Sequence, residues 1–402
     1  MKILHTADWH LGHRLHEQSQ YEEQELFLNW LENYIVSNCY DVLLISGDVF
    51  DTTMPSNQSL SQYYGFLMRL QNTCCKHIVI TGGNHDSPGT LNAPKDLLNA
   101  LNINVVGKST DTIEEELFHL STDKESVFVG AVPYLRDQDV RKAVAGESFN
   151  DSNERYKSAL IQHYNALANA CEKININNNP VLAMGHLFAI GGSISDSEKD
   201  ISVGNLGHIG ADDFPTYFDY VALGHLHRPQ IIGGNNIIRY SGSPVILSFS
   251  EVGYDKKIVS ITVTDNAISE ITETTIPEFR NICRVKGDFT TCMQALETIK
   301  TNSYGLEPWI EIVLDNTNTV VDTATFKKKA ELLDFKILKI SLKNNIPTVG
   351  LDVLLENVKK IKTLNPIDVF KKKCEDQNID LNEFEGVEDA FNEVLLLIRE
   401  KN

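Results

Sequence analysis

A carboxylate in a turn after an apolar run is the feature of this sequence best suited to chemistry. Residues 42–45 are apolar and predict a buried strand, and the chain continues as Gly47-Asp48-Val49-Phe50-Asp51. A carboxylate in this position lies at the carboxyl edge of the predicted sheet, where α/β proteins build binding sites. Because a carboxylate has two oxygens, Asp48 can bridge two cations, which a histidine cannot do.

Other residues with metal-ligand chemistry also follow predicted strands. Asp8 and His10 come after a strand over 2–7, and their spacing would place both side chains on one face of an extended segment. Strands predicted over 77–81, 181–184 and 220–223 likewise end in glycine followed by an amide or imidazole. The complete set of carboxylate, amide and imidazole donors is Asp8, His10, Asp48, Asn84, His186, His225 and His227.

These donors predict a centre of two divalent metal ions that share Asp48. Mixed imidazole, carboxylate and amide ligands suit Mn²⁺, with Zn²⁺, Fe²⁺ and Mg²⁺ as alternatives. Asp8, His10 and one of the two histidines after residue 223 would complete the first site, and Asn84, His186 and the other histidine the second. Two cations about 3.5–4 Å apart can hold both the attacking and the leaving oxygen of an in-line displacement at phosphorus. The sequence therefore predicts phosphoester hydrolysis.

The two residues after Asn84 have side chains suited to proton transfer. Because Asn84 is the predicted ligand, the His85 side chain is expected to face the substrate, where it can protonate a leaving alkoxide. Asp86 can orient His85 or cap the next helix. Six further histidines are interpreted as ordinary polar residues: His5, His13, His16, His77, His163 and His208.

The elements that must position these residues alternate between strand and helix, which predicts a layered α/β fold. Apolar stripes predict helices over 21–38, 57–70 and 151–173, and further strands are predicted over 127–132, 237–240, 257–263 and 268–274. Residues 107–126 are interpreted as a polar surface excursion, and residues 191–210 as a mobile loop near the site.

Three domains follow from this pattern. Residues 1–277 carry every ligand candidate, and residues 278–345 predict a small β-α-β-α-β domain without a ligand cluster. Residues 346–402 are interpreted as a linker and C-terminal helices, of which the last has one apolar face. That face packs either on its own chain or in the groove of a partner.

Net charge, the length of apolar runs and the cysteine count exclude some classes of protein. The net charge of −19 argues against a protein that binds nucleic acid over its whole surface, although a partner can supply the basic surface for such binding. Apolar runs stay well below the roughly 18 residues of a membrane span, and the N-terminus lacks a signal-peptide pattern. The 7 cysteines lack framework spacing, which is typical of reduced thiols, so a cytoplasmic location is expected.

Taken in order, the motifs resemble those of the calcineurin-like metallophosphoesterases. Within that family, the sequence is similar to the nuclease subunits of double-strand-break repair complexes of bacteria, archaea and eukaryotes. The segments that carry the similarity are Ala7-Asp8-Trp9-His10-Leu11-Gly12, residues 47–51, Phe218-Asp219-Tyr220-Val221-Ala222-Leu223-Gly224-His225-Leu226-His227-Arg228-Pro229 and Tyr240-Ser241-Gly242-Ser243-Pro244.

The resemblance implies a metallophosphoesterase β-sandwich flanked by helices, with a small α+β capping domain and C-terminal helices. It implies a manganese-preferring 3′→5′ exonuclease on double-stranded DNA and an endonuclease on single strands and hairpins. It also implies a coiled-coil ATPase partner that binds the C-terminal helices, and a homodimer formed through the nuclease domain, which suits the apolar helix over 57–70.

By the same analogy, His227 joins Asp8 and His10, whereas His225 joins Asn84 and His186. Archaeal relatives carry a histidine where this chain has Asp51, which leaves the role of Asp51 open. Two alternatives remain. One is a phosphatase or phosphodiesterase of the same scaffold that acts on small substrates, and the other is a non-catalytic scaffold that binds DNA ends or an ATPase.

Overall fold

The computed structural model describes residues 1–136, 139, 149–193, 195, 198, 209–315 and 323–343. All of these belong to one compact unit, Met1–Lys343. The remaining unit, Asn344–Asn402, lies outside the described residues, and so do the C-terminal helices predicted there. In the described part of the chain, no helix combines the length and apolar character needed to cross a bilayer.

The first large sheet is built around four parallel strands. Their buried, β-branched and leucine-rich sequences fit strands that are covered on both faces. Two antiparallel strands extend the sheet beyond β1. The order is β14 (Ala267–Thr275), β13 (Lys257–Thr264), β1 (Lys2–Thr6), β4 (Val42–Ser46), β5 (His77–Thr81) and β6 (Ile103–Val106).

The second large sheet also has a parallel centre with an antiparallel strand at each edge. Its order is β11 (Gln230–Ile232), β12 (Asn235–Tyr240), β10 (Tyr220–Gly224), β9 (Val181–His186), β8 (Ser126–Ala131) and β7 (Leu117–Ser121). The interpretation of residues 107–126 as a polar excursion is wrong in part, because β7 pairs with β8 along its whole length. Only Leu120 of β7 is buried, so this edge strand lacks the apolar alternation that would have revealed it.

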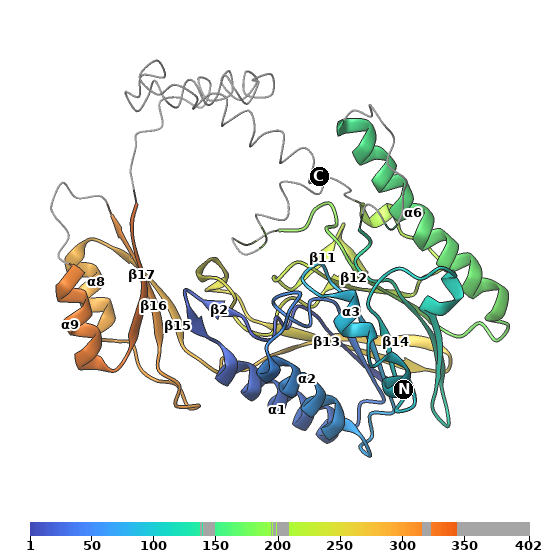
Figure 1. Ribbon diagram of the computed structural model, residues 1–402, viewed down its shortest axis with the longest axis horizontal. Helices are drawn as coiled ribbons and strands as arrows, with labels where there is room; N and C mark the ends of the chain where they lie inside the picture. The colour runs from blue at the N-terminus through green and yellow to red at the C-terminus, as the bar shows by residue number, and fades with distance from the viewer. Residues whose placement is uncertain are drawn as a thin grey trace. The chain divides into compact units, whose positions relative to one another are not determined.

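The two large sheets pack face to face and are covered by helices on their outer faces. Apolar residues of β1, β4 and β5 meet those of β8, β9 and β10 between the sheets, in a core that includes Val42, Leu44 and Met184. Helices α1 (Tyr21–Asn38) and α2 (Asn57–Leu70) cover the first sheet, and α6 (Phe149–Ile174) covers the second (Figure 1). The layered α/β fold predicted from the sequence is confirmed.

Short elements join these layers. In the described ranges, two short helices follow β5, and three single turns of 3₁₀ helix and a two-stranded ribbon lie in the loops. They are α3 (Pro88–Asn92), α4 (Lys95–Asn99), η1 (Ile113–Glu116), η2 (Ala211–Asp213), η3 (Phe249–Glu251), and the ribbon of β2 (Arg14–Leu15) with β3 (Gln18–Ser19).

A third, smaller sheet follows with its own core. It has three parallel strands, and α8 and α9 lie on one of its faces (Figure 1). Its elements are β15 (Ile282–Gly287), α8 (Phe289–Leu296), β16 (Trp309–Asp315), α9 (Thr323–Leu333) and β17 (Lys336–Lys343). The predicted β-α-β-α-β order is therefore confirmed, whereas the domain boundaries at 277/278 and 345/346 stay a prediction.

Candidate metal centre

The carboxyl ends of neighbouring parallel strands bring the predicted ligands to one edge of the sandwich. Asp8, Asp48 and Asn84 follow β1, β4 and β5, which are adjacent in the first sheet. His186 ends β9 and His225 follows β10, which are adjacent in the second sheet. Because β4 packs against both β9 and β10, the two groups of side chains face each other.

The loops after β1 and β4 are turns with left-handed backbone rather than extended segments. Asp8, His10 and Asp48 have φ values of 53°, 45° and 47°. The two loops pair through their backbones, since the amides of Asp8 and His10 donate to the carbonyls of Gly47 and Asp48 at 3.0 Å each. Asp8 and His10 do reach the same site, but the extended geometry expected from their spacing is wrong. The turn between them directs both side chains inward.

Close packing explains why glycine precedes several of the ligands. A Cβ on Gly224 would lie 1.8 Å from the carbonyl oxygen of Ser46, at the point where the two sheets meet. A Cβ on Gly83 would lie 2.1 Å from Oδ1 of Asp48. Any larger residue would push the strand ends apart, so the recurring glycines are a steric requirement of the centre.

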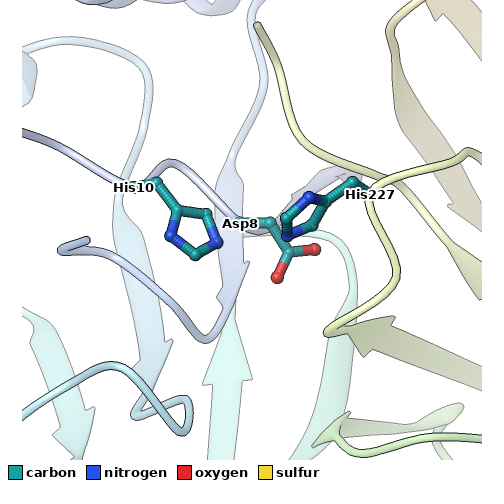
Figure 2. Close-up of side chains that lie close together, drawn as sticks. All are labelled: Asp8, His10 and His227. Carbon is teal, nitrogen blue, oxygen red and sulfur yellow. The ribbon is translucent and has the colours of Figure 1, made fainter. Parts of the chain in front are cut away.

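One group of candidate ligands consists of Asp8, His10 and His227. Each offers an atom within 4.8 Å of the others, and all three side chains are buried. Figure 2 shows them converging, with Asp8 and His10 on the segment after β1 and His227 on the segment after β10. The imidazole rings of His10 and His227 are 5.0 Å apart between centroids.

A second group surrounds Asn84. Its Oδ1 lies 3.0 Å from Nε2 of His186 and 3.1 Å from Nδ1 of His225. Oδ2 of Asp48 lies 3.2 Å from Nε2 of His186 and 3.5 Å from Nε2 of His10. The Asp48 carboxylate therefore borders both groups, as a bridging ligand would.

The unpartnered atoms of the centre fit a bound cation. Within the described residues, Oδ2 of Asp8 and Nε2 of His10 are buried without a hydrogen-bond partner, which is a costly arrangement unless another group binds them. Burial lowers the pKa of His10 to about 4 and that of His225 to about 3, so both imidazoles are neutral and can donate a lone pair. Burial, opposed by His186, raises the pKa of Asp8 to about 7. Divalent cations would satisfy this excess of oxygen and nitrogen donors.

His85 lies beside the centre, and a hydrogen bond from one ring nitrogen fixes its ring. Its Nδ1–H donates to the backbone carbonyl of Asp51 at 2.8 Å, and its backbone amide donates to Oδ1 of Asp48 at 2.9 Å. The half-buried ring is 4.9 Å from that of His10 between centroids. This orientation leaves Nε2 as the ring nitrogen able to face a substrate.

The side chain of Asp86 is directed to a neighbouring loop rather than to the following helix or to His85. It accepts from the backbone amides of Val49, Phe50 and Gly83 at 3.1, 3.0 and 2.9 Å. The cap of α3 is instead Ser87, whose hydroxyl accepts from the amide of Thr90. Both functions expected for Asp86 are therefore wrong. Asp86 fastens the loop after β5 to the loop after β4, which carries Asp48.

The structure also assigns contacts to Asp51, whose role the sequence left open. Its Oδ1 accepts from Nδ1 of His13 at 2.7 Å and lies 3.3 Å from Nδ1 of His10. His13, interpreted as an ordinary polar residue, also donates from Nε2 to the carbonyl of Leu247 at 3.0 Å. Asp51 thus lies between His13, to which it is hydrogen-bonded, and the ring of the candidate ligand His10.

A further acidic residue near the centre was missed. Glu251 is fully buried, and its Oε1 lies 3.1 Å from Nδ1 of His227. Glu251 belongs to no motif with recognisable ligand spacing, and it is 24 residues from its partner along the chain. Spacing in the sequence could not have connected the two.

Comparison with known proteins agrees with this geometry. Residues 1–229 match the family model described as calcineurin-like phosphoesterase. The chain is 34% identical over 313 residues to SbcD of the SbcCD nuclease from Escherichia coli strain K12, covering 78% of this chain and 77% of that protein. It is 34% identical over 270 residues to SbcD from Bacillus subtilis strain 168, covering 66% of each. SbcD from Staphylococcus epidermidis is 28% identical over 313 residues, covering 76% of this chain and 77% of that protein.

Proposed function

Since this chain belongs to the calcineurin-like phosphoesterases and, within them, to the SbcD nucleases, we propose that it is a metal-dependent DNA nuclease. The proposed activities are 3′→5′ exonuclease action on double-stranded DNA and endonuclease action on single strands and hairpins, in DNA repair, recombination and replication. The observation that carries this proposal is the meeting of two groups of buried donors at Asp48. A carboxylate shared by two such groups can hold two metal ions close together, and such a pair can stabilise both the attacking and the leaving oxygen of phosphodiester hydrolysis.

The proposed centre divides its ligands into two sets around Asp48. Asp8, His10 and His227 form the first set, and Asn84, His186 and His225 the second. Two divalent cations, which we propose to be Mn²⁺ with Mg²⁺ as the alternative, would activate a water molecule and neutralise charge on the phosphate.

His85 supplies the proton transfer in this proposal. The hydrogen bond from Nδ1–H to Asp51 fixes the ring, so that Nε2 can carry a proton toward the leaving alkoxide. The hydrogen bond from its backbone amide to Asp48 keeps the ring at the edge of the metal centre. The proton donor His85 and the candidate ligand Asn84 are thus adjacent residues of one loop, which limits their separation.

The proposed partner is an SbcC-like coiled-coil ATPase, in a heterotetramer of two copies of each chain, with DNA as the shared substrate. The net charge of −19 supports a partner that contributes basic DNA-binding surface. The nuclease domain, residues 1–277, is proposed to dimerise, as the family resemblance implies. Residues 278–345 are the proposed capping domain, and the proposed location is the cytoplasm.

An assay with purified chain and Mn²⁺ tests the nuclease activity. Blunt duplex, hairpin and single-stranded DNA would be compared with a small phosphodiester, with and without the ATPase and ATP. We expect Mn²⁺-dependent degradation of DNA that EDTA abolishes. Hydrolysis of the small diester with every DNA left intact would instead favour a small-substrate phosphodiesterase. An inert chain that binds DNA ends would favour a scaffold.

Removal of residues 366–402 tests the docking of the partner. We expect the shortened chain to cleave the small diester at the rate of the full chain, because every candidate ligand lies before residue 228. ATP-dependent action on duplex DNA should be lost, and the ATPase should no longer co-purify. Co-purification of the ATPase with the shortened chain would contradict the assignment of the C-terminal segment.

A further inference from the structure

His227 is held by three buried residues from the segment after β12. These are Ser243, Glu251 and Lys256, here called the Glu251 cluster. Glu251 contacts the ring of His227, and Lys256 lies 3.4 Å from its carbonyl oxygen. The backbone amide of Ser243 also donates to that carbonyl, at 3.2 Å. The family motif at residues 240–244 thus begins a segment whose residues contact the candidate ligand His227.

The contact with Glu251 determines which nitrogen of His227 can bind a metal. A carboxylate only accepts hydrogen bonds, so Nδ1 must carry the proton when it faces Oε1 of Glu251 at 3.1 Å. In the neutral ring, Nε2 then carries no proton, so its lone pair is the one that can bind a metal. Metal-binding histidines commonly use such a carboxylate to fix the tautomer and orientation of the ring.

Hydrogen bonds orient the carboxylate of Glu251, and Lys256 compensates its negative charge. Its Oε2 accepts from Nζ of Lys256 at 2.6 Å and from the backbone amide of Leu247 at 3.0 Å. Nζ of Lys256 also donates to the hydroxyl of Ser243 at 2.7 Å. One carboxylate oxygen therefore accepts from donors of its own segment, and the other accepts from Nδ1 of His227 and from the hydroxyl of Ser195 at 3.2 Å. An ion pair that served stability alone would not require this second contact.

Among the candidate ligands, support by a carboxylate falls on the Asp8 group. Nδ1 of His227 is hydrogen-bonded to Glu251, whereas Nδ1 of His10 lies 3.3 Å from Asp51 without a hydrogen bond. In the other group, Nδ1 of His186 donates to the backbone carbonyl of Ser46 at 3.0 Å, and Nδ1 of His225 faces Asn84. A carboxylate makes the imidazole a stronger donor than a neutral carbonyl does. The two halves of the centre thus differ in their outer contacts.

We infer that Glu251 is the positioning residue that sets metal affinity at the half of the centre formed by Asp8, His10 and His227. The inference rests on the proposed two-metal function. It predicts that loss of the contact between Glu251 and His227 weakens one of two metals and spares the other.

Mn²⁺ titration of the metal-free full-length chain, followed by electron paramagnetic resonance, measures this directly. We expect two bound ions in the wild type. In Glu251→Gln, the amide cannot accept from His227 and from Lys256 and Leu247 at the same time, so one site should weaken by about 10- to 100-fold while the other is unchanged. The matched control is Glu270→Gln on exposed β14, which should keep both affinities.

A second variant separates positioning from folding. Glu251→Asp keeps a carboxylate beside Lys256 but is one methylene too short to reach His227, and should show the same selective loss. Thermal unfolding without Mn²⁺ checks that each variant folds. If either folded variant binds two ions as tightly as the wild type, the role of Glu251 is overturned. If the wild type itself binds no Mn²⁺, the proposed metal centre fails instead.

Discussion

Replacement of Asp48 by Asn is expected to remove both metal ions together and to reduce DNA cleavage by about 1000-fold or more. Oδ2 of Asp48 lies within 3.5 Å of both His10 and His186, so the substitution places an uncharged NH₂ group where both halves need an anionic oxygen. Metal catalysis supplies several kcal/mol, and about 1.4 kcal/mol corresponds to a tenfold change in rate. Metal analysis after desalting and the initial rate of DNA cleavage in Mn²⁺ are the measurements.

The fold should survive this substitution. Asp48 has a φ of 47°, a region in which Asn is one of the best tolerated residues. The Oδ1 atom of Asn can still accept the backbone amide of His85. Asp41→Asn is the matched control, because Asp41 accepts from the amide of Lys2 at the opposite end of β4. A variant at position 48 that retained one tightly bound ion would contradict the bridging role.

The strands and helices of the layers were predicted well because each element has a local pattern of apolar residues. Continuous apolar runs marked the buried parallel strands, and the stripe over 21–38 matched α1, Tyr21–Asn38, to the residue. β7 escaped notice because an edge strand with one buried residue has no clear period. Local patterns of apolar residues reflect burial, so they do not predict an element that is only partly buried.

For the metal centre, the sequence indicated which side chains belong together but not how they are arranged. The order of strand ends brought the candidate ligands to one edge, as a parallel α/β topology requires. It did not reveal the left-handed turns at Asp8 and His10, since spacing says nothing about φ. Strand order alone also could not place His225 and His227 in separate groups, which the family resemblance did, because that depends on which face of the loop after β10 each one occupies.

The residues that support the ligands were the least predictable part. Asp86 was expected to orient His85 or cap the next helix, yet its carboxylate accepts from the amides of Val49 and Phe50 on a different loop. Glu251 contacts His227 only because the chain returns to the centre after β12. Such contacts follow from the tertiary fold, so motif spacing cannot predict them. Metal ligands, in contrast, can be recognised by their residue types.

Replacement of His85 by Gln is expected to abolish cleavage while both metals remain bound. The hydrogen bond that joins His85 to a candidate ligand is made by its backbone amide, to Asp48 at 2.9 Å, and this bond survives the substitution. Loss of a positioned proton donor typically costs about 10²- to 10⁴-fold in rate. Mn²⁺ binding measured beside single-turnover DNA cleavage separates this result from that of Asp48→Asn, in which both properties fall.

His77→Gln provides the matched control, because His77 begins the same strand, β5, whose far end leads to His85. Its Nε2–H donates to the carbonyl of Ser121, away from every candidate ligand. That variant should bind Mn²⁺ and cleave DNA like the wild type. Cleavage at the wild-type rate by the position-85 variant would show that Nε2 of His85 carries no proton to the leaving group. Water at the metal centre would then have to supply that proton, and the orientation of the ring by Asp51 would be incidental.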